Sequence, residues 1–126
     1  MAAHCVLVVD DEEMIRDTLV EFLDDNGYQA IGAIDGRDAL DKLTDAEARP
    51  CVIVLDLMMP IMDGRAFREQ QLADPRLANI PVILLSAHQA VQKNAIDLHV
   101  ADALNKPLRL QELLRLIHKH CPAPCE

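Results

Sequence analysis

The segment over residues 52–60 constrains the fold more than any other part of the chain. Four apolar, partly β-branched residues run directly into the carboxylate Asp56, and Pro60 follows shortly after. An uninterrupted apolar run bounded by breaker residues is typical of a strand that is buried on both faces. The carboxylate would then lie at the carboxyl end of that strand, where open α/β sheets place their chemistry. We therefore expect Asp56 to be a nucleophile or a metal ligand.

The composition predicts one globular domain with an aliphatic core. Of the 126 residues 51% are hydrophobic, yet there is no Trp, one Tyr and two Phe. Twenty-one acidic and twelve basic side chains give a net charge of −9. That balance argues against direct binding of nucleic acid or of an anionic membrane. The excess acid is explained either by solubility or by a local cation site.

The cysteines and the hydropathy pattern indicate a cytoplasmic protein. Cys5 and Cys51 each open an apolar run and are interpreted as small hydrophobic residues in a reducing compartment. Cys121 and Cys125 have a spacing that gives weak support for a metal site. No signal peptide is recognised before the first apolar run, and no apolar run approaches the ~20 residues of a membrane span.

Strand and helix patterns alternate five times along the chain. Strands are expected at 5–9, 28–34, 52–55, 82–86 and 101–105; helices are expected from about 15 to 25, 38–45, 65–72, 90–98 and about 110–120. Asp63 is a candidate N-cap for the third helix, and His118, Lys119 and His120 fall near the negative end of the last one. This order predicts a doubly wound parallel sheet with helices on both faces.

Polar residues follow four of the predicted strands. They are Asp10 and Asp11, Asp56, Ser86, and Lys106. In a parallel sheet these strand ends share one edge. Carboxylates that meet there need a cation, and oxygen ligands without His or Cys favour Mg²⁺. A carboxylate can attack phosphorus to form an acyl phosphate, while an ammonium and a hydroxyl bind the phosphoryl oxygens.

Each of these residues also has an ordinary structural explanation when it is taken alone. Either acid after the first strand is a common helix cap, as is Ser86, and Asp56 could cap the loop after it. Lys106 alone would be a solvated strand end. Capping does not explain why all of them stand at successive strand ends, so a shared function is favoured.

Four motifs resemble the receiver domains of two-component response regulators. They are VVDDE at 8–12, LDLMMPIMDG at 55–64, VILLSA at 82–87 and KP at 106–107. The likeness extends from residue 5 to about residue 119. It implies the flavodoxin-like receiver fold with five strands in the order 2-1-3-4-5, as a single domain over 1–126 with a tail at 120–126.

The resemblance also implies a role for each site residue. Asp56 would accept a phosphoryl group from a histidine of a partner kinase or phosphotransfer protein. Asp11, Asp56 and the backbone carbonyl of Met58 would bind Mg²⁺, with Mn²⁺ as an alternative ion, and Asp10 would act through water. Lys106 would pair with the phosphoryl group and would precede a cis proline, Pro107.

The output side of the resemblance is incomplete. Ser86 would move toward the phosphoryl group and couple it to the face formed by the helix over 90–98, the strand over 101–105 and the last helix. The family usually has an aromatic residue three positions before the lysine, where this chain has Ala103. Met58 and His88 stand at positions that tune phosphoryl lifetime, and no lifetime is predicted from them.

Four functional classes are compared. The leading one is a phosphorylation-controlled regulatory domain and not a turnover enzyme. It is expected to be a monomer or a weak dimer. It would act alone or as part of a larger regulator or hybrid kinase. Ala103 leaves room for a receiver-like interaction module that switches weakly. An aspartyl-nucleophile, Mg²⁺-dependent phosphatase is disfavoured because Met58 stands where a second aspartate would act as acid and base. Flavin binding is disfavoured because no phosphate-binding loop rich in Gly, Ser or Thr follows the first strand.

Overall fold

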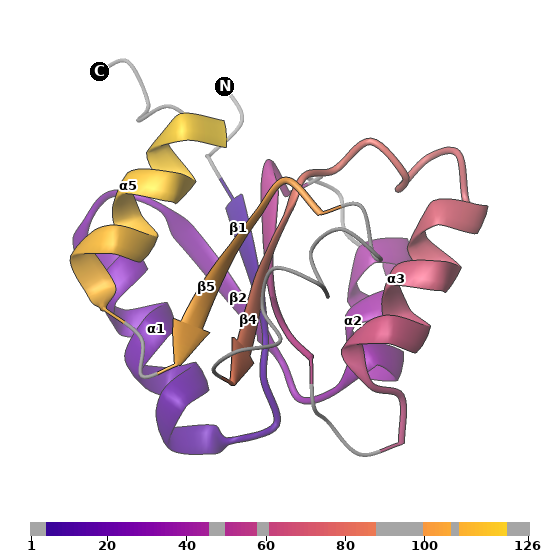
Figure 1. Cartoon of the computed structure of the whole chain (residues 1–126), viewed down its shortest axis with the longest axis horizontal. Helices are drawn as coiled ribbons and strands as arrows, with labels where there is room; N and C mark the ends of the chain where they lie inside the picture. The colour runs from indigo at the N-terminus through magenta and orange to yellow at the C-terminus, as the bar shows by residue number, and fades with distance from the viewer. Residues whose placement is uncertain (1–4, 46–49, 58–60, 88–99, 107–108, 121–126) are drawn as a thin grey trace.

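The protein forms a five-stranded parallel sheet covered by helices on both faces (Figure 1). The computed structural model describes residues 5–45, 50–57, 61–87, 100–106 and 109–120. The strand order β2-β1-β3-β4-β5 is the predicted one. Helices α1 and α5 cover one face, and α2 and α3 cover the other. The elements are β1 Cys5–Val9, α1 Glu13–Asp25, β2 Gln29–Ala33, α2 Gly36–Asp45, β3 Val52–Asp56, α3 Gly64–Ala73, β4 Val82–Ala87, β5 Asp102–Lys106 and α5 Leu110–His120.

The two central strands explain why the sheet separates two apolar layers. Every residue of β1 and β3 is buried, as their uninterrupted apolar runs predict. Successive side chains alternate between faces: Val6 and Val8 belong to the cluster under α1 and α5, whereas Leu7 belongs to the cluster under α2 and α3. The edge strand β2 is one residue shorter at each end than its predicted range. Its first residue, Gln29, is exposed.

The helices pack on these clusters through their apolar stripes. Leu19 and Leu23 of α1 are buried as the helical pattern predicts. In α5 the third buried residue beside Leu113 and Ile117 is Leu116, while Leu114 is only partly buried. The helix expected at 90–98 lies outside the described residues.

Local capping decides where the helices begin and end. Asp63 caps α3, because its side chain accepts a 2.9 Å hydrogen bond from the N–H of Ala66 as predicted. Helix α2 begins at Gly36 rather than at the predicted Asp38. The Asp35 carboxylate accepts a 2.8 Å hydrogen bond from the N–H of Asp38, which places the residues between them in the first helical turn. Gly27, with φ of 92°, follows α1 in the left-handed region.

The two cysteines before the central strands differ from each other. Cys5 is a buried free thiol, and burial raises its pKa. The prediction of a reduced Cys51 is wrong, because its sulfur is disulfide-bonded. Cys121 and Cys125 lie outside the described residues. Cys51 precedes β3 and is partly buried. In the described part of the chain no helix has the length and hydropathy needed to cross a bilayer.

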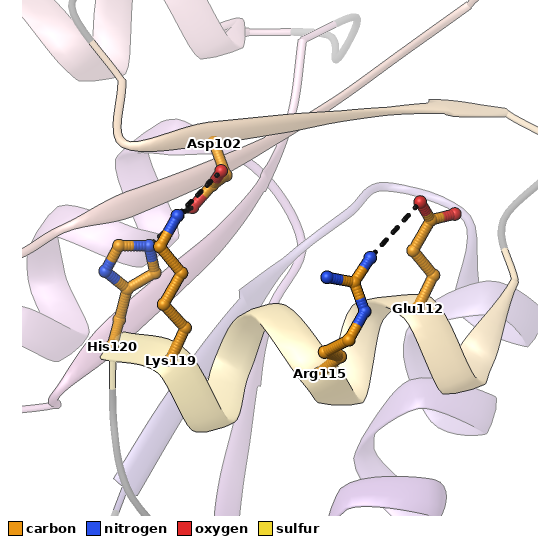
Figure 2. A network of polar contacts seen from close by, with 5 residues as sticks. All are labelled: Asp102, Glu112, Arg115, Lys119 and His120. Carbon is orange, nitrogen blue, oxygen red and sulfur yellow. Dashed lines mark hydrogen bonds and ion pairs between the residues drawn. The ribbon is translucent and has the colours of Figure 1, made fainter.

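An ionic contact ties the end of α5 to the beginning of β5 (Figure 2). The Asp102 carboxylate lies 3.3 Å from Lys119 Nζ and 2.5 Å from His120 Nε2. Both basic residues are in the last helical turn, where cations interact favourably with the helix dipole, as predicted. The neighbouring His118 forms a different contact, in which its Nδ1 lies 2.7 Å from the hydroxyl of Tyr28. These contacts hold α5 to the start of each edge strand, at Tyr28 before β2 and at Asp102 in β5.

This contact makes stability depend on pH in a definite direction. Burial alone would raise the pKa of Asp102, but hydrogen bonds from His120 and Lys119 outweigh it and lower the pKa below the ordinary 3.8. A depressed carboxyl pKa adds stability above the unfolded-state pKa, and that stability is lost as pH falls through the folded-state pKa. We expect Asp102→Asn to lower the free energy of unfolding at neutral pH, with a difference from wild type that shrinks below pH 3.8. Urea titrations across pH measure this. Glu112→Gln, which removes an exposed pair, is the control, and a pH-independent difference at Asp102 would contradict the assignment.

Candidate functional site

Three carboxylates meet at the carboxyl edge of the sheet. Asp10 and Asp11 follow β1, Asp56 ends β3, and one ligand oxygen from each lies within 4.8 Å of the others. The cause is strand pairing: Val9 is level with Leu55, so the next residue of each strand is an aspartate at the same height. We call these three residues the acid cluster. The predicted meeting of acids from the first and third strands is therefore present, and their chemical roles stay predictions.

The three acids differ in burial. Asp10 is 0% and Asp56 is 3% exposed, whereas Asp11 is exposed. One oxygen of Asp10 accepts a 2.9 Å hydrogen bond from the N–H of Glu12, the residue before α1, and this bond does not cap the helix. Buried carboxylates close to a third one are costly unless a cation or hydrogen bonds compensate them. An oxygen-only donor set with one solvent-facing member fits a hard divalent ion that keeps several waters.

The strands that carry Ser86 and Lys106 end at the same edge. Asp56 is level with Leu85, the residue before Ser86, and Lys106 is level with Ala87. The backbones of both residues therefore lie beside the end of β3 or just beyond it. Their side chains are outside what the structure describes, and Met58, Pro107 and His88 fall outside the described residues altogether.

The chain after β3 packs directly against the backbone of Asp56. The N–H of Gly64 donates to the carbonyl of Leu57 at 2.8 Å. A Cβ at Gly64 would lie 2.7 Å from the Asp56 carbonyl oxygen and 2.8 Å from Leu57 Cα. Only glycine lets α3 begin so close to this strand end. The loop is also tied to α2, because the N–H of Gly36 donates to the Met62 carbonyl at 2.9 Å.

Arg16 contacts the site but is absent from the predicted set. Its guanidinium donates a 2.9 Å hydrogen bond to the backbone carbonyl of Asp10. It also influences Asp38: burial would raise the pKa of this carboxyl, but hydrogen bonds from Lys42 and from the N–H of Ile34, together with the charges of Lys42 and Arg16, lower it. The signal in the sequence is an arginine one turn into the helix that follows an acid pair.

Apolar side chains are exposed around this edge. Of the four large hydrophobic residues exposed in the described part of the chain, three lie near it: Met14 in the first turn of α1, Ile34 after β2, and Ile61 in the loop after β3. Met14 is 83% and Ile61 87% exposed. Exposed apolar groups beside a polar site are typical of a surface that contacts another protein.

The family follows from a comparison with known proteins. The model of the response regulator receiver domain matches residues 6–118. The chain belongs to this family. The match covers β1 through most of α5 and includes the acid cluster together with the ends of β4 and β5. This receiver domain is therefore a regulatory domain of the response regulator type.

Curated relatives and solved structures agree with this assignment. The chain is 40% identical over 115 residues to response regulator RR06 of Streptococcus pneumoniae, covering 89% of this chain and 50% of that protein. It is 39% identical over 111 residues to response regulator MprA of Mycolicibacterium vanbaalenii, covering 86% of this chain and 46% of that one. The chain thus spans about half the length of these relatives.

The structural neighbours match almost over their full length. The chemotaxis protein CheY4 of Vibrio cholerae superimposes with a TM-score of 0.84 at 30% identity, covering 94% of this chain and 99% of that one. A response regulator receiver protein from Pseudomonas putida gives 0.85 at 31% identity, covering 94% and 98%. The predicted fold and family are confirmed.

The close contact at Gly64 gives a stability prediction. Gly64→Ala inserts a methyl group against the backbone of Asp56 and Leu57, and such overpacking costs about 1–3 kcal/mol. Gly27→Ala is the comparison: it has open space but a positive φ, so strain alone should cost about 1–2 kcal/mol. Urea unfolding of both variants checks the values. A Gly64→Ala protein as stable as wild type would show that the start of α3 is not packed as described.

Proposed function

We propose that this receiver domain accepts a phosphoryl group on Asp56, with a divalent cation held by the acid cluster, and thereby controls a partner protein. The observation that carries the proposal is the convergence of Asp10, Asp11 and Asp56, two of them buried, at the edge where the strands end. A cap or a solvated surface would not need two buried acids beside a third. Membership of the receiver family supports the same chemistry.

Mg²⁺ is the proposed ion, and Mn²⁺ would serve in its place. Asp11 and Asp56 would ligate it with the backbone carbonyl of Met58, and Asp10 would act through water. The donors are all oxygens, and neither His nor Cys belongs to the cluster. When bound, the ion neutralises the carboxylates and the oxygens of the incoming phosphoryl group.

The remaining chemistry belongs to the side chains. A carboxylate oxygen of Asp56 attacks phosphorus, the new O–P bond forms as the P–N bond to the donor histidine breaks, and the leaving imidazole takes up a proton. We assign the Lys106 ammonium and the Ser86 hydroxyl to the phosphoryl oxygens. The burial of Asp56 limits access of bulk water to the acyl phosphate.

The phosphodonor is proposed to be a histidine kinase or a phosphotransfer protein. A protein donor accounts for the exposed Met14, Ile34 and Ile61 beside an acidic site, because these residues offer apolar contact area around it. A small metabolite would not need such a surface. The proposal is therefore a cytoplasmic switch in two-component signalling that turns over only its own phosphoryl group.

The output side departs from the usual aromatic switch. Ala103 in β5 is partly buried and packs on the cluster under α2 and α3. A methyl group has no alternative inward and outward positions, so we propose that phosphorylation signals through Ser86 and its surroundings without a ring movement at residue 103. An interaction module that switches weakly is the alternative that this residue favours.

Phosphorylation is tested directly by intact mass. Incubation with Mg²⁺ and acetyl phosphate should add the mass of one phosphoryl group, and Asp56→Asn should abolish the addition because the nucleophile is gone. Asp63→Asn is the matched control, since it removes a nearby carboxylate while Asn retains capping ability. Cleavage of the adduct by hydroxylamine would distinguish an acyl phosphate from a phosphoester on Ser86. An unmodified wild type, or an adduct that survives Asp56→Asn, would refute the proposal.

The acid cluster also predicts opposite effects with and without metal. Two like charges 4 Å apart in water repel by about 1 kcal/mol, so Asp11→Asn should raise the free energy of unfolding by up to about that amount in the absence of a divalent ion. With MgCl₂ the wild type should gain stability by ligand binding, and the variant should gain less. Urea titrations with and without MgCl₂ measure both effects, and Asp17→Asn, an exposed acid of α1, is the control. Equal stabilisation of both proteins by MgCl₂ would argue against a role for Asp11 as a ligand.

A further inference from the structure

We propose that Arg16 is a positioning residue for the acid cluster, because its guanidinium holds the backbone of Asp10. The inference rests on the proposed cation site and extends it to a residue that touches neither the ion nor the phosphoryl group. Three groups that lie together support it: the guanidinium of Arg16, the carbonyl of Asp10, and Gly32, over which the Arg16 stem lies.

The backbone of Asp10 is held on both sides just beyond the end of β1. Its N–H donates to the carbonyl of Ala33 in β2 at 3.0 Å. Its carbonyl accepts the 2.9 Å hydrogen bond from Arg16 Nη1. A charged donor makes a stronger hydrogen bond than a neutral one. The peptide unit that leads from Asp10 to Asp11 is therefore fixed in orientation.

This fixation matters most for Asp11. The Asp10 side chain is buried and also accepts a hydrogen bond from the N–H of Glu12. The Asp11 side chain is exposed, so its orientation depends on the backbone that carries it. A metal site needs its ligands placed before the ion arrives, and residues that orient ligands affect affinity without touching the metal. Loss of the Arg16 contact should therefore weaken cation binding while leaving the carboxylates intact.

Gly32 provides the space through which Arg16 reaches the site. A Cβ at this position would lie 3.0 Å from Arg16 Cδ and 3.1 Å from Cγ. The arginine stem thus lies directly over Gly32 of β2. A methyl group here would push the stem by a few tenths of an ångström and misalign the guanidinium. Gly32→Ala therefore perturbs the same contact without removing the charge.

A competing explanation is that Arg16 only neutralises Asp38, whose pKa its charge helps to lower. Lys42 acts on the same carboxyl more strongly, with its Nζ 2.9 Å from Oδ2 of Asp38. Lys42→Met is therefore the matched control. It removes a cation from Asp38 but leaves the hydrogen bond to the Asp10 carbonyl in place.

The test measures Mg²⁺ affinity of the whole chain by calorimetry in wild type, Arg16→Met, Arg16→Lys, Gly32→Ala and Lys42→Met. Arg16→Met should raise the Mg²⁺ dissociation constant about 10-fold, within the range for residues that orient metal ligands. Arg16→Lys should recover part of the affinity, because an ammonium can donate to one carbonyl but lacks the planar guanidinium. Gly32→Ala should give a smaller loss, and Lys42→Met should leave the constant unchanged.

A second measurement needs no metal. Amide hydrogen exchange at Glu12, whose N–H donates to Asp10, should accelerate in Arg16→Met and Arg16→Lys relative to Lys42→Met at matched global stability. A wild type that binds no Mg²⁺ would overturn both this inference and the proposed site. A wild type that binds Mg²⁺ beside an Arg16→Met protein of equal affinity and unchanged Glu12 exchange would overturn this inference alone. If Arg16→Met does not fold, Arg16→Lys and Gly32→Ala decide by the same two measurements.

Discussion

The mutual repulsion of three carboxylates is the constraint around which this domain is built. Asp10 and Asp56 come to one height because β1 and β3 pair in parallel with Val9 level with Leu55. Apolar burial of both strands holds them there although the carboxylates repel. The free energy of burying the strands thus keeps the carboxylates together, and a bound cation would reduce the remaining repulsion between them.

Supporting contacts surround this constraint on each side. Gly64 allows α3 to begin against the backbone of Asp56, and Arg16 holds the backbone of Asp10. At the start of β5, away from the acid cluster, Lys119 and His120 tie α5 to Asp102 (Figure 2). Each contact joins the terminal turn of a helix to a strand or to the residue that follows one. The site and the helix α5 are therefore parts of one packed body, which is what a switch that couples them would need.

Much of the fold and part of the site could be predicted without coordinates. The apolar runs located β1, β3 and β4 to within a residue at each end, because fully buried strands carry an uninterrupted pattern. The edge strand β2 was also placed to within a residue at each end, although it is partly exposed and its pattern is weaker. The start of α2 was misplaced because the carboxylate of Asp35, three residues before the predicted start, accepts a hydrogen bond from the N–H of Asp38. In α5 the local pattern does not single out the buried Leu116, because several leucines compete for one face.

The sequence alone determined which residues stand at the ends of the strands, because local hydrophobic patterning sets the strands and a polar residue ends each run. From that, the parallel fold and the acid cluster follow. Tertiary structure alone decided the contacts that bring helices against strands: Arg16 over Gly32, Gly64 against Asp56, and Lys119 beside Asp102. Such contacts depend on the register and spacing of packed layers, which no local pattern encodes.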